Sequence, residues 1–281
     1  MSTTSVTVVV PTRDRPDALA ACLEALRGQT LPVAVVVVDD GSADPERVAS
    51  VVAATPRTQL LRLGGRGPAA ARNAGIDRAG SEVVCLTDDD CRPEPGWAAE
   101  LVAQLEAGAS VTAGPTVVGD PADPGATAAQ AVTNHLVHES HDPEAGAVGV
   151  APTSNLAARR AVLTSLPFDE AYPAAAGEDR DWCDRLARAG GAIAWAPAAV
   201  VHHHPALPLW AFWRQQVRYG RGARRVHTTG AGRPAELGFY LRLARRGFAA
   251  GWRPGLLVVL AQLATATGYV AERRAARRQP R

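Results

Sequence analysis

Short β-branched runs alternate with helical stretches through residues 5–90, and this order constrains the fold more than any other feature. The strand-like runs, such as VAVVVV at residues 33–38, are continuously apolar, which is typical of strands buried on both faces. The alternation predicts an α/β fold with a doubly wound, mostly parallel sheet. Strands are predicted at residues 5–10, 33–38, 59–63 and 82–86, and helices at 17–27, 45–54 and 68–79.

The middle of the chain is less regular. Residues 119–149 form a long polar segment rich in proline and glycine, which predicts a flexible loop on the substrate side of the sheet. Around it, helices are predicted at 97–106 and 177–189, and strands at 110–118 and 192–201. The last of these strands runs into His202, His203 and His204.

Charge is unevenly distributed along the chain. Residues 1–213 contain 15 Arg and 26 acidic residues, a net charge of −11, whereas residues 214–281 contain 15 Arg and two acidic residues, a net charge of +13. We therefore expect a globular domain over residues 1–205 and an arginine-rich helical region over 206–281. The basic region indicates an anionic partner. A membrane surface is expected rather than nucleic acid, because no aromatic stacking platform is interleaved with the arginines.

Residues 255–271 form an apolar stretch of 17 residues with arginines on both sides, at the lower limit for a membrane span. Gln262, Thr265, Tyr269 and Glu272 would form one polar stripe on a helix, which favours a helix lying in the interface of an anionic membrane. A span and a core helix are the alternatives. With no signal-like start and no disulfide spacing among four cysteines, we expect a cytoplasmic protein, peripheral or anchored at the inner face of the membrane.

Three consecutive carboxylates, Asp88, Asp89 and Asp90, directly follow the predicted strand at 82–86. Like charges in a row repel one another, and a cation relieves that repulsion. A hard divalent ion held by one or two carboxylates and completed by phosphate oxygens suits a nucleotide substrate. The alternative interpretation is a solvated acidic turn or a cap for the next helix.

A second acidic pair, Glu178 and Asp179, begins the predicted helix at 177–189. Negative charge at a helix N-terminus is favoured by the helix dipole, so simple capping is one interpretation. The other is a carboxylate that takes a proton from an attacking hydroxyl. The glycine-rich residues 64–67 lack the lysine of a phosphate-binding loop and are interpreted as a turn.

Histidines offer two further candidates. At most one of His202, His203 and His204 can face a metal from one side of a strand, because neighbouring side chains alternate. His135, His138 and His141 are not expected to bind a metal, since no carboxylate or cysteine set completes a coordination sphere.

Six motifs occur in an order that resembles the inverting family 2 glycosyltransferases, which have the glycosyltransferase A fold and use nucleotide-diphosphate sugars. They are VVVPTRDRP (8–16), VVDDGS (37–42), AAARNAG (69–75), LTDDDCRPEPGW (86–97), SNLAARRAVL (154–163) and GEDRDWCDRL (177–186). The resemblance covers about 220 residues. It implies a Rossmann-like sheet of the glycosyltransferase A type, followed here by a helical, basic C-terminal extension.

The resemblance also implies roles for individual residues. The general base would be Asp179, and the cofactor a manganese or magnesium ion. Nucleotide contacts would come from Pro11, Thr12, Asp14, Asp40, Arg72 and Asp88. Metal ligands would come from Asp88, Asp89, Asp90 and His202, with two possible registers of the triplet. On the acceptor or diphosphate side would lie Asn155, Glu178, Gln215 and Arg218.

The implied reaction is inverting transfer of a sugar from a nucleotide-diphosphate sugar, UDP-linked by default, to a hydroxyl acceptor. The acceptor would be a glycan, a lipid-linked molecule or a small molecule, in cell-envelope or glycoconjugate synthesis. Residues 215–219 (QQVRY) resemble the Q-x-x-R-W motif of processive synthases, with Tyr219 in place of Trp. Processivity is not expected, since the chain lacks their several long membrane helices, and an arginine-rich helix on lipid head groups is the alternative. For the whole chain, the alternative is a non-catalytic, membrane-associated sugar-nucleotide-binding or assembly protein.

Overall fold

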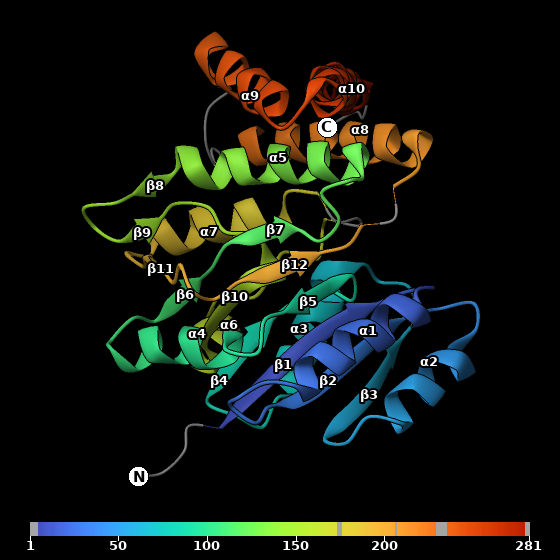
Figure 1. Cartoon of the computed structure of the whole chain (residues 1–281), viewed down its shortest axis with the longest axis vertical. Helices are drawn as coiled ribbons and strands as arrows, with labels where there is room; N and C mark the ends of the chain where they lie inside the picture. The colour runs from blue at the N-terminus through green and yellow to red at the C-terminus, as the bar shows by residue number, and fades with distance from the viewer. Residues whose placement is uncertain (1–4, 173–175, 206, 229–234, 279–281) are drawn as a thin grey trace.

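The computed structural model describes residues 5–172, 176–205, 207–228 and 235–278 (Figure 1). Within this part of the chain, nine strands form one sheet in the order β3-β2-β1-β4-β10-β6-β11-β9-β8. Its first four strands are parallel, which confirms the predicted arrangement. They are β1 (Val6–Thr12), β2 (Ala34–Asp40), β3 (Thr58–Leu63) and β4 (Val83–Leu86).

Helices cover both faces of this sheet (Figure 1), as its continuously apolar strands predict. Along β1, Val8 and Val10 pack on one face while Val9 packs on the other. The first face is covered by α1 (Pro16–Arg27), α2 (Pro45–Ala53) and α4 (Trp97–Glu106). The second is covered by α3 (Pro68–Arg78), α6 (Arg160–Ser165) and α7 (Glu178–Arg188).

The rest of the sheet is mixed. Strand β10 (Leu156–Arg159) follows the short 3-10 helix η1 (Thr153–Asn155) and runs antiparallel to both β4 and β6. Beyond it lie β6 (Val111–Ala113), β11 (Ile193–Trp195), β9 (Ala147–Val148) and β8 (His141–Asp142). A separate three-stranded sheet contains β5 (Cys91–Pro93), β12 (Val201–His203) and β7 (Thr116–Val118).

Two predicted strands are each divided between these two sheets. Residues 110–118 form β6 and β7, and residues 192–201 form β11 and the start of β12. At Gly114 a Cβ atom would lie 2.1 Å from the Ala199 carbonyl oxygen, so the two segments lie backbone to backbone where they pass from one sheet to the other. The apolar pattern alone does not reveal this change of sheet.

The expectation of a flexible loop over residues 119–149 is wrong, because the segment contains the helix α5 (Pro124–Glu139). Asp123 caps this helix by accepting hydrogen bonds from the Gly125 and Ala126 N–H groups, at 2.7 and 3.1 Å. Its buried Ala128 and Ala129 pack against helices from the end of the chain. Partners so distant in sequence supply the stability that the local composition does not indicate.

The C-terminal helices α8 (Leu209–Thr228), α9 (Leu237–Ala249) and α10 (Trp252–Arg278) lie over α5 (Figure 1). A Cβ atom on Gly220 would lie 1.9 Å from the Thr265 carbonyl oxygen, so α8 and α10 touch backbone to backbone. These helices share a hydrophobic cluster with α5. The boundary that we propose near residue 205 marks a change in charge along the sequence. The hydrophobic cluster of α5 and the C-terminal helices nevertheless extends across it.

Among the described helices, α10 is long and apolar enough to cross a membrane, judged by length and composition. Within Trp252–Arg277, the most apolar stretch of 18 residues has a mean hydropathy of 1.5, and 33% of this stretch is buried inside the protein. A core helix of a soluble protein passes the same test, so this feature alone is weak evidence for a span.

Candidate active site

The acidic triplet lies at the carboxyl ends of the parallel strands, where open α/β sheets bind their ligands. Strand β1 ends at Thr12, which pairs in register with Asp39 of β2. Strand β4 ends at Leu86 and leads directly into Thr87 and the triplet. Three strand ends thus bring polar side chains to one edge.

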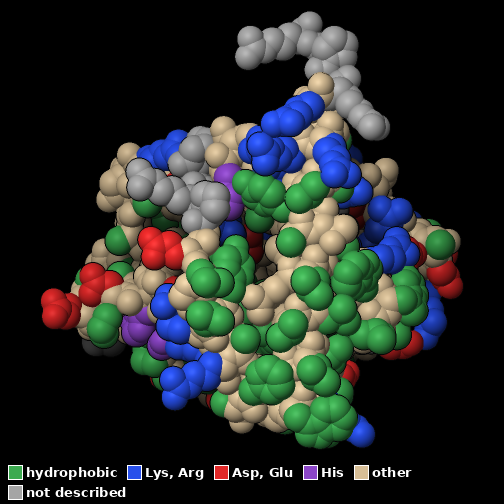
Figure 2. Space-filling model, turned by 90° about the horizontal axis from the view of Figure 1, so that it is seen from above, with side chains coloured by type: hydrophobic (Ala, Val, Ile, Leu, Met, Phe, Trp, Pro, Cys, Tyr) green, Lys and Arg blue, Asp and Glu red, His purple; other side chains and the backbone are tan. Residues whose placement is uncertain are grey.

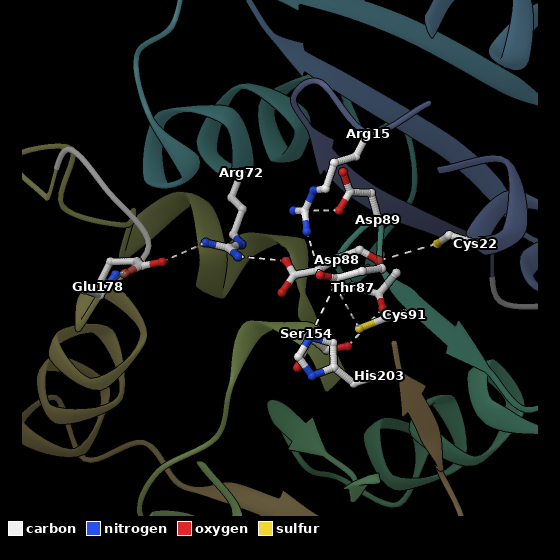
Figure 3. Close-up of polar contacts among 12 residues, drawn as sticks. Arg15, Cys22, Arg72, Thr87, Asp88, Asp89, Cys91, Ser154, Glu178 and His203 are labelled. Carbon is white, nitrogen blue, oxygen red and sulfur yellow. Dashed lines mark hydrogen bonds and ion pairs between the residues drawn. The ribbon is translucent and has the colours of Figure 1, made fainter. Parts of the chain in front are cut away.

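The three aspartates have different partners, and Figure 3 shows Asp88 directed toward Arg72 and Asp89 toward Arg15. Asp89 is fully buried: Thr12 Oγ1 donates to its Oδ2 at 2.7 Å, and Arg15 Nη2 lies 2.8 Å from Oδ1 as an ion pair without hydrogen-bond geometry. Burial raises the pKa of Asp89 to about 7, although Arg15 opposes the rise. Asp88 and Asp90 keep 29% and 11% of their side-chain surface exposed. Of the two registers, Asp88 with Asp90 is the pair that is accessible.

Arg72, on α3, joins the two acidic motifs (Figure 3). Its Nη2 lies 2.9 Å from Asp88 Oδ1, and its Nη1 lies 3.0 Å from Glu178 Oε1. Burial by itself would lower the pKa of Arg72, but Asp88 and Glu178 outweigh it and raise that pKa. A permanently charged guanidinium therefore lies between the triplet and the first turn of α7.

The first turn of α7 holds both members of the second acidic pair. Gly177 has a φ of +95°, a conformation that favours glycine, and positions the turn. Glu178 Oε2 accepts from the Ala176 N–H at 2.8 Å, so Glu178 is committed to Arg72 and to this helix end. Asp179 is half-buried, and its Oδ1 accepts from the Arg180 N–H at 2.7 Å. Burial raises the pKa of Asp179, which suits a proton acceptor.

His203, rather than His202, lies beside the triplet. Its Nε2 is 3.4 Å from Asp90 Oδ1, and its Nδ1 is 2.9 Å from Gln130 Oε1. His202 points to the other side of β12, where its Nε2 lies 3.0 Å from Glu94 Oε1. Strand alternation explains the exchange. His203 and Arg15 outweigh burial and hold the pKa of Asp90 below its ordinary value.

Two cysteines border the triplet: Cys22 Sγ donates to the Asp88 carbonyl oxygen at 3.5 Å, and Cys91 Sγ donates to Asp90 Oδ1 at 3.9 Å (Figure 3). His135 is buried in α5, and its Nε2 lies 3.0 Å from the Phe239 carbonyl oxygen. The four cysteines are free and buried. Within the described residues, no three His, Cys, Asp or Glu side chains gather closely enough to hold a metal ion by themselves.

Asp40 and Asp14, both expected at the nucleotide, accept hydrogen bonds from backbone N–H groups of neighbouring loops. Asp40 accepts from the Arg66 and Gly67 N–H groups, each at 2.7 Å, so its carboxylate closes the glycine-rich turn at 64–67. Asp14, at a φ of +58°, accepts from the Ala43 N–H at 2.7 Å. Thr12 is buried beneath Asp89, and Pro11 is half-buried within β1.

Asp39 is a buried residue at the same edge, within the VVDDGS motif, to which the resemblance gave no role of its own. Its Oδ1 accepts from the Ser42 N–H at 3.0 Å. Its pairing with Thr12 across the sheet was the signal that could have identified it, because that register follows from two neighbouring parallel strands.

Asn155, expected on the acceptor or diphosphate side, is fully buried in the core. Its Oδ1 accepts from Trp97 Nε1 at 2.8 Å, and its Nδ2 donates to the carbonyl oxygens of Pro115 and Ala199. These three bonds hold together the two segments that pass between the sheets near Gly114. Gln215 and Arg218 lie on α8, where Arg218 lines a cavity next to the segment that precedes α7.

The site thus combines two accessible carboxylates with an adjacent imidazole, a charged guanidinium and a carboxylate of raised pKa. Carboxylate oxygens and imidazole are ligands for hard and borderline divalent ions. Asp179 stands on a different element from the triplet, so it can meet a second substrate while the triplet meets the first. Such a site suits transfer between two substrates.

Comparisons with known proteins agree on a family. The sequence profile described as Glycosyl transferase family 2 matches residues 7–163. Glycosyltransferase AglE of Haloferax volcanii is 31% identical over 237 residues, which are 79% of this chain and 73% of that protein. Pre-mycofactocin glycosyltransferase of Mycobacterium tuberculosis is 29% identical over 224 residues, which are 78% of this chain and 46% of that protein.

Solved structures share the fold. Mannosyltransferase PcManGT of Pyrobaculum calidifontis, solved with GDP-Man and Mn2+, matches with a TM-score of 0.63 and 23% identity, over 98% of this chain and 76% of that one. TarS of S. aureus matches with a TM-score of 0.55 and 15% identity, over 97% of this chain and 55% of that one. At such identities the likeness concerns the fold alone.

Proposed function

Since this chain belongs to glycosyltransferase family 2, we propose that it moves a sugar from a nucleotide-diphosphate sugar to a hydroxyl acceptor, with inversion at the anomeric carbon. The observation that best supports this proposal is that the Arg72 guanidinium pairs with both Asp88 and Glu178. That contact puts a donor-side carboxylate and the segment of the general base around one space.

The donor half of the proposal rests on charge. Arg72 offers a fixed positive charge beside Asp88, suited to the developing charge on a departing diphosphate. The Pyrobaculum mannosyltransferase, solved with GDP-Man and Mn2+, supports a nucleotide-diphosphate donor here. Uracil is the base that the family resemblance favours, and guanine and thymine are the alternatives. With Asp40 committed to the turn, Asp39 is our candidate for the base contact.

The residues at the triplet fit a manganese or magnesium ion. Such an ion uses one or two protein carboxylates and takes further oxygens from substrate phosphates, so a site with few protein ligands is expected. Asp88 and Asp90 are the accessible carboxylates, and His203 adds an imidazole beside Asp90. We propose that Asp88 and Asp90 would hold the ion together with phosphate oxygens of the donor, with the His203 imidazole beside Asp90, and that the bound ion would neutralise charge on the diphosphate.

Asp179 is the proposed general base. Its raised pKa favours taking the proton from the acceptor hydroxyl, which then attacks the anomeric carbon from the face opposite the diphosphate. Glu178 is tied to Arg72 and to the Ala176 N–H, so it orients the turn rather than exchanging protons. One displacement inverts the sugar, and no covalent intermediate is required.

We further propose that the enzyme works at an anionic membrane surface. The large exposed hydrophobic side chains gather on the C-terminal helices, where Figure 2 shows them as a patch beside arginines. They are Leu209, Trp210, Leu237, Tyr240, Leu241, Phe248, Trp252, Leu256, Val259, Leu263 and Val270. An apolar face bordered by arginines suits lipid tails and anionic head groups together. Because α10 packs backbone to backbone on α8, docking on the surface is favoured over a separate span.

The alternative is a non-catalytic protein that binds sugar nucleotides, and one experiment separates the two. Purified protein in mild detergent is screened against UDP-, GDP- and dTDP-sugars, first with Mn2+ and then with a chelator. The enzyme should bind one donor and slowly release its nucleotide only with the metal. Binding without any release favours the non-catalytic protein, and no binding under either condition contradicts both.

A further inference from the structure

One face of α8 carries a row of arginines, Arg214, Arg218, Arg221 and Arg225. On a helix with 3.6 residues per turn, these positions fall within about 60° of one another. Like charges three and four residues apart destabilise a helix. The row therefore costs α8 some stability, and an anion bound beside it would relieve the repulsion.

The arginine row lines a cavity of about 440 Å³ whose other walls include Tyr172, Ala176 and Trp213. Glu272 is the acidic residue in its lining, and it lies 2.8 Å from Arg225 Nε. Among the described residues, Arg221 has no hydrogen bond or ion pair and is exposed. The lining thus contains four arginines and, beside Arg225, the carboxylate of Glu272.

The cavity adjoins the catalytic turn. Ala176, in its wall, donates its N–H to Glu178 Oε2 at 2.8 Å. A Cβ atom on Gly222, also in the wall, would lie 2.1 Å from the Ala176 carbonyl oxygen, so α8 presses directly on this segment. An anion in the cavity would therefore lie next to the first turn of α7, which carries Asp179.

The N-terminal end of the arginine row, at Arg214, lies beside the exposed hydrophobic side chains of α8. Trp210 is 63% exposed, and the Arg214 guanidinium lies 5.4 Å from the centre of its ring. Leu209 beside it is also exposed. A ligand could thus place an anionic group among the arginines and an apolar chain on the face of α8–α10.

We propose that this arginine cavity binds the phosphate of an acceptor in which a phosphate links a glycan to a lipid. The inference rests on the proposed function, since it assigns the acceptor of that reaction. Guanidinium groups bind phosphate oxygens in pairs, and the four arginines with Glu272 leave a net positive charge in the cavity for a phosphate or diphosphate ester. The lipid lies on the apolar face, and a hydroxyl of the glycan reaches Asp179.

The test uses dodecyl phosphate as the probe, below its micelle concentration, with the full-length protein in metal-free buffer. Binding is measured by calorimetry for the wild type, Arg221→Gln and Arg253→Gln. Arg253 is an exposed arginine of α10 that lies outside the cavity lining, so its loss changes the net charge equally. Inorganic phosphate and phosphatidylglycerol vesicles are titrated in parallel.

Arg221→Gln should weaken dodecyl phosphate binding at least tenfold, whereas Arg253→Gln should leave it within twofold of the wild type. Vesicle binding should fall equally in both variants, because a membrane senses net charge. The proposal is overturned if the wild type does not bind dodecyl phosphate, if both variants weaken its binding equally, or if inorganic phosphate binds as tightly. Donor binding with Mn2+, measured on the same samples, should be unchanged by Arg221→Gln. Its absence from the wild type would contradict the proposed function and not the cavity.

Discussion

The guanidinium of Arg72 lies 3.0 Å from Glu178 Oε1, a contact between α3 and the first turn of α7 that spans 106 positions of sequence. Both side chains are buried, at 4% and 5% exposed. The same guanidinium holds Asp88, so one residue sets the separation of Asp88 and Glu178.

Arg72→Met should destabilise the protein by about 3–5 kcal/mol, because it leaves Glu178 as a buried, unpaired charge. Adding Glu178→Gln should recover a large part of that loss, since the uncompensated charge is then removed. Free energies of unfolding from urea titration measure both effects. Simple additivity of the two single changes would show that the contact contributes nothing specific.

Asp179→Asn should lower turnover by about a hundred- to ten-thousandfold while leaving donor binding nearly unchanged. Because burial raises the pKa of Asp179, the base is deprotonated only at a higher pH than an ordinary aspartate. The wild-type rate should therefore rise with pH through this raised pKa, and the variant should lack that rise. The turnover rates of the two proteins are measured as a function of pH. A rise in the variant that matches that of the wild type would exclude Asp179 as the base.

Asp89 should make stability depend on pH. Its pKa is raised from 3.8 to about 7, so the native state holds this proton more tightly than the unfolded chain. The stabilisation is complete below about pH 4 and is lost as the pH rises to about 7. Asp89→Asn stays neutral, so its stability relative to the wild type should increase across that interval. Unfolding in buffer with a chelator measures it, and a constant difference would contradict the burial account.

His203→Ala and His202→Ala form a matched pair on neighbouring residues of β12. His203 lies beside Asp90 and His202 beside Glu94, so we expect only the first change to weaken Mn2+ binding, by about tenfold to a hundredfold. Free Mn2+ is counted by electron paramagnetic resonance in the presence of the donor. Equal effects of the two changes would remove His203 from the assignment.

Local pattern predicted the parallel half of the sheet because each buried strand is a continuous apolar run, as at residues 33–38. It also identified the acidic motifs that Arg72 joins. It did not predict α5, whose buried face is covered by helices that follow it by 70 residues or more. Nor did it distinguish Asp40, which binds backbone N–H groups 26 and 27 positions away. Those partners depend on the tertiary fold, which a motif does not encode.

Metal-dependent, inverting transfer is tested most directly by a proton NMR time course of donor consumption, with Mn2+ and then with a chelator. The anomeric proton reports both the release of the nucleotide and the configuration of the sugar when it first appears. We predict metal-dependent release in which the sugar first appears with the inverted configuration, and loss of the signal in Asp179→Asn. A product that first appears with retained configuration, or turnover that persists in the chelator, would contradict it.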